Sequence, residues 1–214
     1  MAKKRVGVLV SGRGSNLQAL LDACADPAYP AEIVLVISNV ADAYGLERAR
    51  KAGIAALAIS HKDFPSREAF DAAMDRELRQ ASVEIVCLAG FMRLLSQGFV
   101  ESWAGRMINI HPSLLPSFKG LHTHAQALAA GVKLHGCTVH LVTPGLDDGP
   151  PIAQAAVPVL PDDDEDSLAA RVLEQEHKAY PLALRLLAEG RVQLNNGAVK
   201  VLASGMGALL NPMP

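Results

Sequence analysis

The chain has 214 residues, which is enough for one substantial hydrophobic core and short for two independent domains. Its 20 Lys and Arg residues stand against 22 Asp and Glu residues, so the formal net charge of -2 gives no broad attraction to a polyanion and argues against nucleic acid as a partner. The apolar runs are too short for a signal sequence or a membrane span. We expect one domain over residues 1–204, a frayed tail over residues 205–214, a cytoplasmic location and no membrane partner.

Three cysteines, Cys24, Cys87 and Cys137, are far apart in apolar surroundings and lack CxxC spacing. An odd number of widely spaced cysteines is typical of buried structural thiols. The pattern fits a reducing compartment.

Short β-branched apolar runs alternate with segments of helical periodicity along the first half of the chain. Strands are predicted at residues 5–10, 32–37, 54–59, 83–88 and 106–110, and helices at residues 15–24, 42–52, 66–80 and 96–103. A Ser or Asp stands at the start of each helix as a candidate N-cap. With right-handed crossovers, this alternation predicts an α/β fold with a doubly wound, mostly parallel, Rossmann-like sheet.

The pattern changes in the C-terminal half. Strands at residues 133–142 and 152–159 have no obvious helix between them, which predicts antiparallel edge strands. A long helix is predicted at residues 166–188, after an acidic segment that we interpret as a solvated loop favouring the helix N-terminus. Two short runs, residues 191–194 and 198–202, flank an Asn-Asn-Gly turn signal and predict a hairpin.

A glycine-rich loop over residues 11–16 joins the first predicted strand to the first predicted helix. Backbone N–H groups at such a junction can hold an anion, so the loop predicts a phosphate site. The dinucleotide fingerprint would require a glycine where Leu17 stands and an acidic residue near Ser38 and Asn39, so NAD is not expected. A tight turn without a ligand is the alternative.

An amide, an imidazole and a carboxylate are offered by Asn109, His111 and Asp147. Asn109 and His111 stand at positions i and i+2 of a predicted strand that Pro112 ends, so both side chains can leave one face at the edge of the sheet. These groups are the parts needed to stabilise a tetrahedral oxyanion and to move protons during acyl transfer. The sequence therefore predicts a catalytic site there.

Glu176 lies on an otherwise apolar stripe of the long predicted helix. A carboxylate on that face requires a partner, because leaving it unpaired in a buried place is costly. A substrate amine or sugar hydroxyl would serve. A boundary glutamate that reaches water or pairs with a nearby Arg is the alternative.

The histidines include His111, His122, His124, His135 and His140, which together could be assembled into a metal site. Their spacing does not support one, since neither HExxH nor a Cys/His cluster is present, and we expect no metal. His135 and His140 are interpreted as packing or hydrogen-bonding residues on a strand. His124 begins a helical stretch near the Asn109 loop, where it could support or face a substrate.

Several motifs carry a resemblance that covers residues 6–194. They are SG-GSNLQA at the first loop, GLERAR at 45–50, LAGFMR at 88–93, NIHPSLLP at 109–116, GLHTH at 120–124, LD-GP at 146–150 and QEH at 175–177. With them the chain resembles the phosphoribosylglycinamide formyltransferases, folate-dependent enzymes of purine biosynthesis. The HPSLLP element is shared with other 10-formyltetrahydrofolate enzymes, whereas the Gly-Ser-Asn loop and the Gln-Glu-His helix indicate the acceptor.

The resemblance implies a role for individual residues. The catalytic trio matches at Asn109, His111 and Asp147, with Asp147 favouring the charged imidazole and helping to relay a proton. The ribotide site matches at Gly14, Ser15, Asn16 and Glu176. The folate pocket matches at Arg67, Met92, Arg93, Leu94, Leu95, Asn109, Thr143, Pro144, Gly145, Leu146 and Asp147. The implied co-substrate is 10-formyltetrahydrofolate, without a metal, in a monomer or homodimer that binds small molecules.

Departures from the family pattern fall around the same site. Arg13 occupies the variable position of the first loop, residues 117–119 replace a lysine-aromatic-proline-like run, and Pro144 and Gly145 alter the folate loop. Asp148 stands where a glycine often follows the catalytic Asp, so it could compete for the role of Asp147. Alternatives remain: another 10-formyltetrahydrofolate-dependent formyltransferase or hydrolase, each expected to carry a further domain, or a non-catalytic folate- or nucleotide-binding module.

Overall fold

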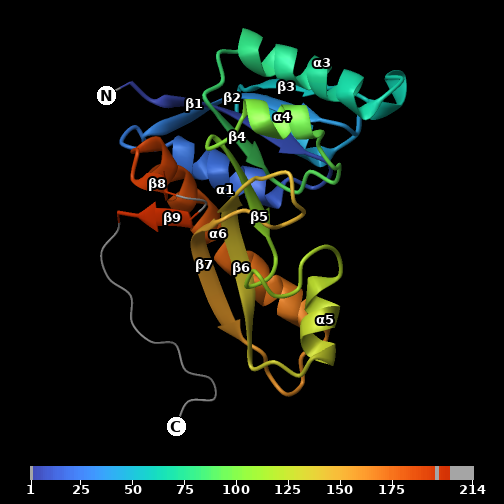
Figure 1. The fold of residues 1–214 in the computed structure, drawn as a ribbon, viewed down its shortest axis with the longest axis vertical. Coiled ribbons are helices and arrows are strands. Elements are labelled where there is room, and N and C mark those ends of the chain that lie inside the picture. The colour runs from blue at the N-terminus through green and yellow to red at the C-terminus, as the bar shows by residue number, and fades with distance from the viewer. Residues whose placement is uncertain (1, 196–197, 203–214) are drawn as a thin grey trace.

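The computed structural model describes residues 2–195 and 198–202, and a seven-stranded sheet forms its centre (Figure 1). The strands are β1 Lys4–Val10, β2 Ala31–Ser38, β3 Ala55–Ala58, β4 Ile85–Leu88, β5 Met107–His111, β6 Leu134–Leu141 and β7 Pro151–Pro158. Their order is β3-β2-β1-β4-β5-β6-β7, with the first five parallel and β6 and β7 joined antiparallel at one edge. The predicted mostly parallel sheet with antiparallel edge strands is confirmed.

Helices cover both faces of this sheet. They are α1 Ser15–Cys24, α2 Tyr44–Lys51, α3 Arg67–Gln80, α4 Gln97–Ser102, α5 Thr123–Ala129 and α6 Glu165–Ala188, with one 3-10 turn at His61–Asp63. Apolar side chains of α1, α2, α5 and α6 bury against one face, and those of α3 and α4 against the other. The sheet is therefore doubly wound, which brings the carboxyl ends of β1, β4 and β5 to one edge.

The predicted N-caps hold for only half of the first four helices. Ser66 and Ser96 accept hydrogen bonds from the backbone N–H groups of Ala69 and Phe99, at 3.1 and 3.4 Å, and cap α3 and α4. The prediction was wrong for α1 and α2, which follow Gly14 and an alanine and have no side-chain cap. At Gly14 the backbone is left-handed, with φ of 68°, so the turn geometry selects glycine there.

Helix α6 begins with a capping box. Asp164 accepts from the backbone N–H of Ser167 at 2.8 Å, and the Ser167 hydroxyl accepts from the backbone N–H of Asp164 at 3.0 Å. Asp163 is different, because it forms two hydrogen bonds with Arg171, both at 2.7 Å, and its side chain is only 3% exposed. The prediction of a solvated acidic loop was therefore wrong for Asp163.

The chain's C-terminal part forms a separate antiparallel pair, β8 Val192–Asn195 and β9 Ala198–Val201, as the two short runs predicted. The Asn196 and Gly197 positions of the predicted turn and the tail over residues 205–214 lie outside the described residues. Cys87 and Cys137 are buried free thiols, while Cys24 is partly exposed. No helix in the described ranges is long and apolar enough to cross a membrane.

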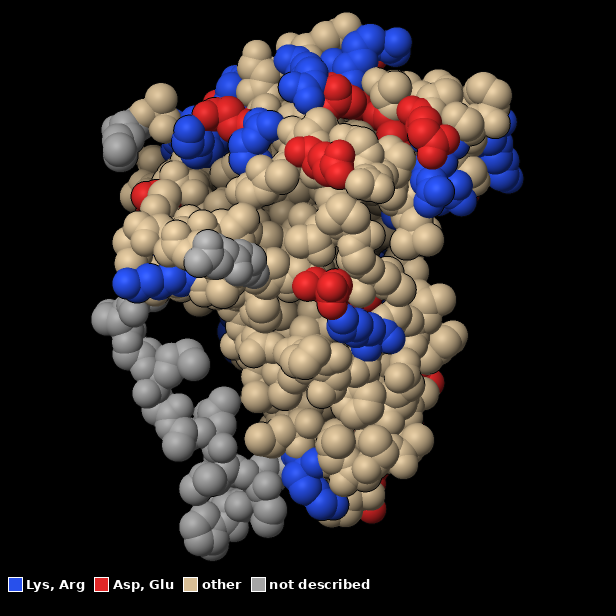
Figure 2. Space-filling view, viewed as in Figure 1, with Lys and Arg blue, Asp and Glu red and all other residues tan. Residues whose placement is uncertain are grey.

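Charged side chains on the face drawn in Figure 2 are mixed in sign. Lys and Arg alternate with Asp and Glu over its upper part, around α3 and α4, and the lower part over β6 and β7 carries few charges. This face therefore offers no extended basic field of the kind that binds nucleic acid.

Candidate active site

The first loop packs tightly against α2. A Cβ atom added to Gly14 would lie 2.8 Å from Gly45 Cα, and the N–H of Gly45 donates to the Gly12 carbonyl at 3.0 Å. Both the left-handed φ and this contact exclude a side chain at Gly14. The first turn of α1 starts at Ser15, so its N–H groups have no partner within the helix and are available to an anion.

Glu176 lies beside this loop. Its side chain projects from α6, the residue is 7% exposed, and Oε2 accepts a hydrogen bond of 2.7 Å from Asn16 Nδ2. Burial raises the pKa of Glu176, and the hydrogen bond from Asn16 opposes that rise. Asn16 Oδ1 is buried without a hydrogen-bond partner. The structure thus joins two residues 160 positions apart and leaves a buried acceptor between them.

Asn109 and His111 project from the same face of β5, as their spacing predicts, and lie opposite His140 and Thr138 of β6. His111 is 5% exposed, and its Nε2 contacts the Phe118 carbonyl at 2.9 Å. Because a carbonyl only accepts, Nε2 carries a hydrogen. His111 Nδ1 then faces Asp147 Oδ2 at 3.3 Å, an arrangement that is favourable when Nδ1 also carries a hydrogen. Both ring nitrogens of His111 therefore face oxygen acceptors.

Asp147 and Asp148 have different environments. The Asp147 side chain is 10% exposed, and its Oδ2 accepts from the backbone N–H of Gly120 at 2.9 Å as well as facing His111. Asp148 is exposed and pairs with Lys119, whose hydrogen bond holds the pKa of Asp148 below its usual value. Geometry therefore assigns the partner of His111 to Asp147. The two unusual residues, Lys119 and Asp148, have each other as partners across neighbouring loops.

Polar side chains on the antiparallel strands hold the loop after β5. The Thr138 hydroxyl donates to the Ser113 carbonyl at 2.7 Å and accepts from the N–H of Leu115 at 3.0 Å. Gln154 Nε2 donates to the Leu115 carbonyl at 2.9 Å. Thr123 Oγ1, at the start of α5, donates to the Pro112 carbonyl at 2.7 Å. These hydrogen bonds fix the loop that directly follows β5, the strand of Asn109 and His111.

The residues predicted to line the folate pocket form separate groups. Met92 and Leu94 follow β4 and are 66% and 64% exposed, and Leu146 in the loop before β7 is 58% exposed. Arg67 begins α3, and Asp71 of that helix accepts from the N–H of Ser96 at 2.6 Å, which ties α3 to the end of the 92–95 segment. Within the described part of the chain, Arg67 pairs with Glu68 and makes no hydrogen bond or ion pair with the 143–147 loop. Large apolar side chains are thus exposed in the segment after β4 and in the loop before β7.

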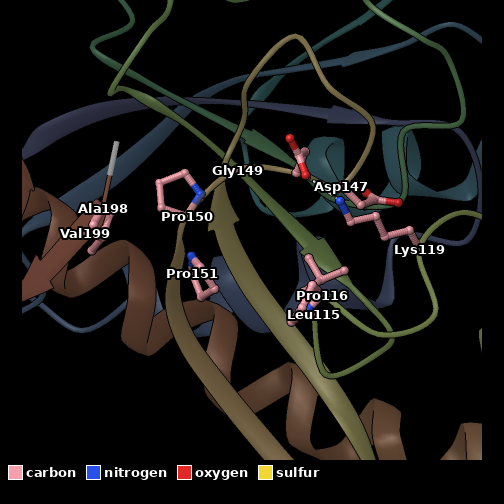
Figure 3. A pocket seen from close by; sticks show the side chains of 10 residues that line it. Leu115, Pro116, Lys119, Asp147, Gly149, Pro150, Pro151, Ala198 and Val199 are labelled. Carbon is pink, nitrogen blue, oxygen red and sulfur yellow. Dashed lines mark hydrogen bonds and ion pairs between the residues drawn. The ribbon is translucent and has the colours of Figure 1, made fainter. Parts of the chain in front are cut away.

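A cavity of about 390 Å³ adjoins Asp147 (Figure 3). It is lined by Leu115, Pro116, Lys119, Asp147, Asp148, Gly149, Pro150, Pro151, Ala198 and Val199. Of the residues predicted to bind substrates, this cavity includes only Asp147. A smaller cavity of about 160 Å³ includes Thr143 and Pro144 with part of α4 and the hairpin residue Leu194. Neither cavity joins the two predicted substrate sites.

Two histidines outside the trio contact each other. His135 Nε2 lies 3.2 Å from His124 Nδ1, and burial lowers the pKa of His135 to about 4. His122 precedes α5 in a left-handed conformation. Within residues 2–195 and 198–202, no three His, Cys, Asp or Glu side chains are grouped as metal ligands.

Comparison with known proteins identifies the family. The model of the family described as formyl transferase matches residues 4–184. The chain belongs to the formyl transferase family. It is 52% identical over 191 residues to phosphoribosylglycinamide formyltransferase of Escherichia coli strain K12, covering 89% of this chain and 90% of that protein. The structure of glycinamide ribonucleotide transformylase 1 from Symbiobacterium toebii matches with a TM-score of 0.91 and 52% identity, over 94% of this chain and 95% of that one.

A longer relative is also similar. The trifunctional purine biosynthetic protein adenosine-3 of Drosophila pseudoobscura pseudoobscura is 61% identical over 193 residues, which cover 89% of this chain. The chain spans only 14% of that protein's length.

Sequence reasoning missed the backbone groups and the partner strand around the trio. The Phe118 carbonyl and the Gly120 N–H contact His111 and Asp147, and neither contact depends on side-chain identity. His140 had been interpreted as a packing or hydrogen-bonding residue, and the structure gives its partner as Asn109. Strand pairing could have indicated this contact, because a residue one strand away at the right register faces the same side.

Proposed function

We propose that the chain transfers the formyl group of 10-formyltetrahydrofolate to the amine of glycinamide ribonucleotide, giving formylglycinamide ribonucleotide and tetrahydrofolate in de novo purine biosynthesis. The observation that carries the proposal is the buried group at the end of β5, where His111 lies between Asp147 and the Phe118 carbonyl and Asn109 shares its face. A donor amide and a charged imidazole stabilise an oxyanion more strongly than they stabilise the carbonyl of the ground state. This group of side chains therefore favours acyl transfer.

The reaction begins when the neutral glycinamide amine attacks the formyl carbon on N10 of the folate. The formyl oxygen becomes an oxyanion, to which Asn109 and His111 donate hydrogen bonds. His111 Nε2 donates to the Phe118 carbonyl, and a negatively charged oxygen within reach is the stronger acceptor. The imidazole therefore exchanges a neutral acceptor for the charge that develops during the reaction, which is the differential binding that catalysis requires.

Proton balance requires one net transfer. The amine loses a proton as it becomes an amide, and N10 gains one as the bond between N10 and the formyl carbon breaks. Asp147 is near His111 and is only partly exposed, so it can accept the amine proton or pass it through the imidazole. No covalent intermediate with the protein is needed.

The acceptor site would use both sides of the first loop. The phosphate lies on the N–H groups at the start of α1, which favour an anion. Glu176 accepts from the ribose hydroxyls, and the unpartnered Asn16 Oδ1 offers a further acceptor close by. Asn16 therefore connects the phosphate and ribose ends of the acceptor, a role more specific than that of a phosphate ligand alone.

The donor site would use the exposed apolar side chains of Met92, Leu94 and Leu146. Covering them with the flat pterin ring removes apolar surface from water, which stabilises the complex. Arg93 and Arg67 supply the positive charge that the folate's carboxylates would meet. Both are among the residues that the family resemblance assigns to the folate.

The proposal is tested by following tetrahydrofolate formation with three acceptors offered separately to the same protein: glycinamide ribonucleotide, water and initiator methionyl-tRNA. We expect turnover with the ribonucleotide and none above background with the other two. A His111→Ala protein serves as the control for contaminating activity. Turnover with water alone would indicate a hydrolase, turnover with the tRNA would indicate a different acceptor, and folate binding without turnover would indicate a binding module.

A further inference from the structure

Among the residues that the structure describes, His140 is the only one whose side chain is hydrogen-bonded to the side chain of Asn109. The two lie directly opposite each other on β5 and β6, and Asn109 Nδ2 is 3.3 Å from His140 Nε2. His140 is 2% exposed, so neither water nor a substrate surrounds its ring. Its other nitrogen, Nδ1, lies 2.9 Å from the carbonyl of Leu141. Both edges of the ring are therefore engaged.

The Leu141 carbonyl determines which nitrogen of His140 carries the hydrogen. Because a carbonyl only accepts, Nδ1 must donate, and a neutral ring then has a bare lone pair at Nε2. Burial lowers the pKa of His140, which keeps the ring neutral, although the nearby Asp147 carboxylate opposes this effect. The other charged groups facing the ring are His111 and Lys119, and both favour the neutral form.

A bare Nε2 can only accept, so Asn109 must turn its amide nitrogen toward His140. The reversed amide would bring Asn109 Oδ1 against the Nε2 lone pair, two acceptors facing each other. With one N–H committed to His140, the second N–H and Oδ1 of Asn109 have defined directions. The first member of the trio is thus oriented by a residue that none of the sequence motifs includes.

We propose that His140 is a positioning residue that fixes the amide of Asn109 so that its second N–H points to the oxygen of the transferred formyl group. This inference rests on the proposed function, since it concerns the oxyanion formed in formyl transfer. It does not make His140 a proton donor or acceptor for the substrate. Asp147 Oδ1 is 3.9 Å from His140 Nε2, beyond hydrogen-bond distance, so Asn109 remains the partner through which His140 acts.

Gly149 keeps the carbonyl of Leu141 in place. A Cβ atom added to Gly149 would lie 1.7 Å from that oxygen and 3.2 Å from His140 Nδ1, so the chain passes directly over this contact. The pairing of β6 with β7 also shifts register between Val139 and His140, next to the residue whose ring contacts Asn109. The orientation of the ring is therefore built into the backbone on both sides.

The test compares two replacements of His140. Leucine fills much of the space without accepting a hydrogen bond, whereas glutamine can offer Oε1 to Asn109. We expect His140→Leu to lower kcat about tenfold to a hundredfold with little change in either KM. A misdirected Asn109 amide would lose its hydrogen bond to the oxyanion, and that hydrogen bond stabilises mainly the transition state. His140→Gln should recover a substantial part of that loss. Equal kcat values for the two variants would overturn the proposal.

A double-mutant cycle separates positioning from a general structural effect. In an Asn109→Ala background, His140→Leu should reduce kcat by less than about twofold, because the group that His140 orients is already absent. The same fold loss in both backgrounds would overturn the proposal. If the wild-type protein formed no tetrahydrofolate with the ribonucleotide, the proposed function would fail instead, before any variant is compared.

The tautomer can be measured without a variant. A long-range ¹H–¹⁵N correlation spectrum of the wild-type protein at neutral pH distinguishes hydrogen on Nδ1 from hydrogen on Nε2. We expect the His140 ring to be neutral with its hydrogen on Nδ1. A charged ring, or hydrogen on Nε2, would remove the acceptor that the positioning role requires, even if the His140 variants did not fold.

Discussion

The catalytic end of β5 and the segments assigned to the folate differ in how their side chains are held. His111 is 5% exposed and contacts a carboxylate and a carbonyl, whereas Met92 and Leu94, in the segment after β4, are 66% and 64% exposed. The first region is ordered by hydrogen bonds within the protein itself. The second presents apolar surface that a ligand would cover.

This difference has a physical reason. Oxyanion stabilisation requires dipoles fixed before the reaction, because reorganising them during the reaction would cost the energy that they supply. Binding a flat apolar ring requires only that exposed surface be removed from water, which is largely non-directional. Changes in the buried region should therefore affect kcat or a single substrate strongly. Changes in the exposed region should have graded effects on affinity.

The largest effect is expected for His111→Ala. The imidazole interacts most strongly with the oxyanion, so kcat should fall about a hundredfold or more while both KM values change little. Steady-state kinetics on a variant whose circular dichroism matches the wild type would measure this. Turnover close to that of the wild type would remove His111 from the catalytic trio and contradict the comparison.

The next effect concerns the acceptor end of the buried region. Glu176→Ala should raise the KM for glycinamide ribonucleotide about tenfold to a hundredfold, the cost of one or two charge-assisted hydrogen bonds, with little change in the KM for the folate. Glu174, exposed on the same helix, provides the matched control Glu174→Ala. Inorganic phosphate should compete with the ribonucleotide and not with the folate. If Glu176→Ala chiefly weakened folate binding, the two substrate sites would have been exchanged.

The two neighbouring aspartates, Asp147 and Asp148, offer a comparison within one loop, between β6 and β7. Asp147→Asn should lower kcat about tenfold or more and move its pH profile toward acidic pH, since the charged imidazole loses its counter-ion. Asparagine also tolerates the left-handed backbone, φ of 46°, found at Asp147. Asp148→Asn removes an exposed pair with Lys119 and should change kcat by less than about twofold. The reverse ranking in pH-rate profiles would transfer the role to Asp148.

In the exposed region we expect smaller changes. Leu94→Ser should raise the KM for the folate by about threefold to tenfold. Leu94 is 64% exposed, so a ligand that covers it gains part of the transfer free energy of a fully buried leucine. Its effect on the KM for the ribonucleotide should be negligible. Leu182→Ser, at a residue 52% exposed on α6, is the control for loss of surface apolarity elsewhere. An unchanged folate KM would exclude Leu94 from the donor site.

Much of the fold followed from periodicity in the sequence, but the caps and contacts did not. Short apolar runs predicted every strand of the sheet, most clearly the central ones, because strands buried on two faces require apolar residues throughout. The bounds of α1, residues 15–24, were predicted correctly, but its cap was not, since Ser15 resembles a cap while the left-handed Gly14 holds the N-cap position. Asp163 was expected in solvent. The sequence could not show that Arg171, eight residues further along and within α6, forms hydrogen bonds with it.

The site divides in the same way. Residues with unusual chemistry, such as Glu176 on an apolar stripe, were recognised because their place contradicts the pattern around them. Their partners were not, because Asn16 lies 160 positions away and the Phe118 carbonyl and Gly120 N–H are backbone groups. The choice between Asp147 and Asp148 as the partner of His111 also required the structure. Two adjacent aspartates differ only in where their side chains point, which the sequence does not show.

The smallest effect links the buried carboxylate to stability. The pKa of Glu176 is raised by burial, so the folded protein retains a proton at pH values where the unfolded chain has lost it. Stability therefore falls as pH rises from the ordinary glutamate pKa, about 4.3, through the raised folded value, and the full cost remains at neutral pH. Glu176→Gln removes this titration and keeps an oxygen that can accept from Asn16.

We therefore expect Glu176→Gln to melt a few degrees above the wild type at neutral pH, since 1 kcal/mol shifts Tm by about 2–4 °C in a chain of this size. The difference should shrink as pH falls toward 4, where the wild-type carboxyl is protonated in both states. Melting curves across this pH range, with the exposed Glu174→Gln as control, measure it. A variant less stable than the wild type at neutral pH would mean that Asn16 compensates the buried charge fully, and that binding the ribose requires no sacrifice of stability at Glu176.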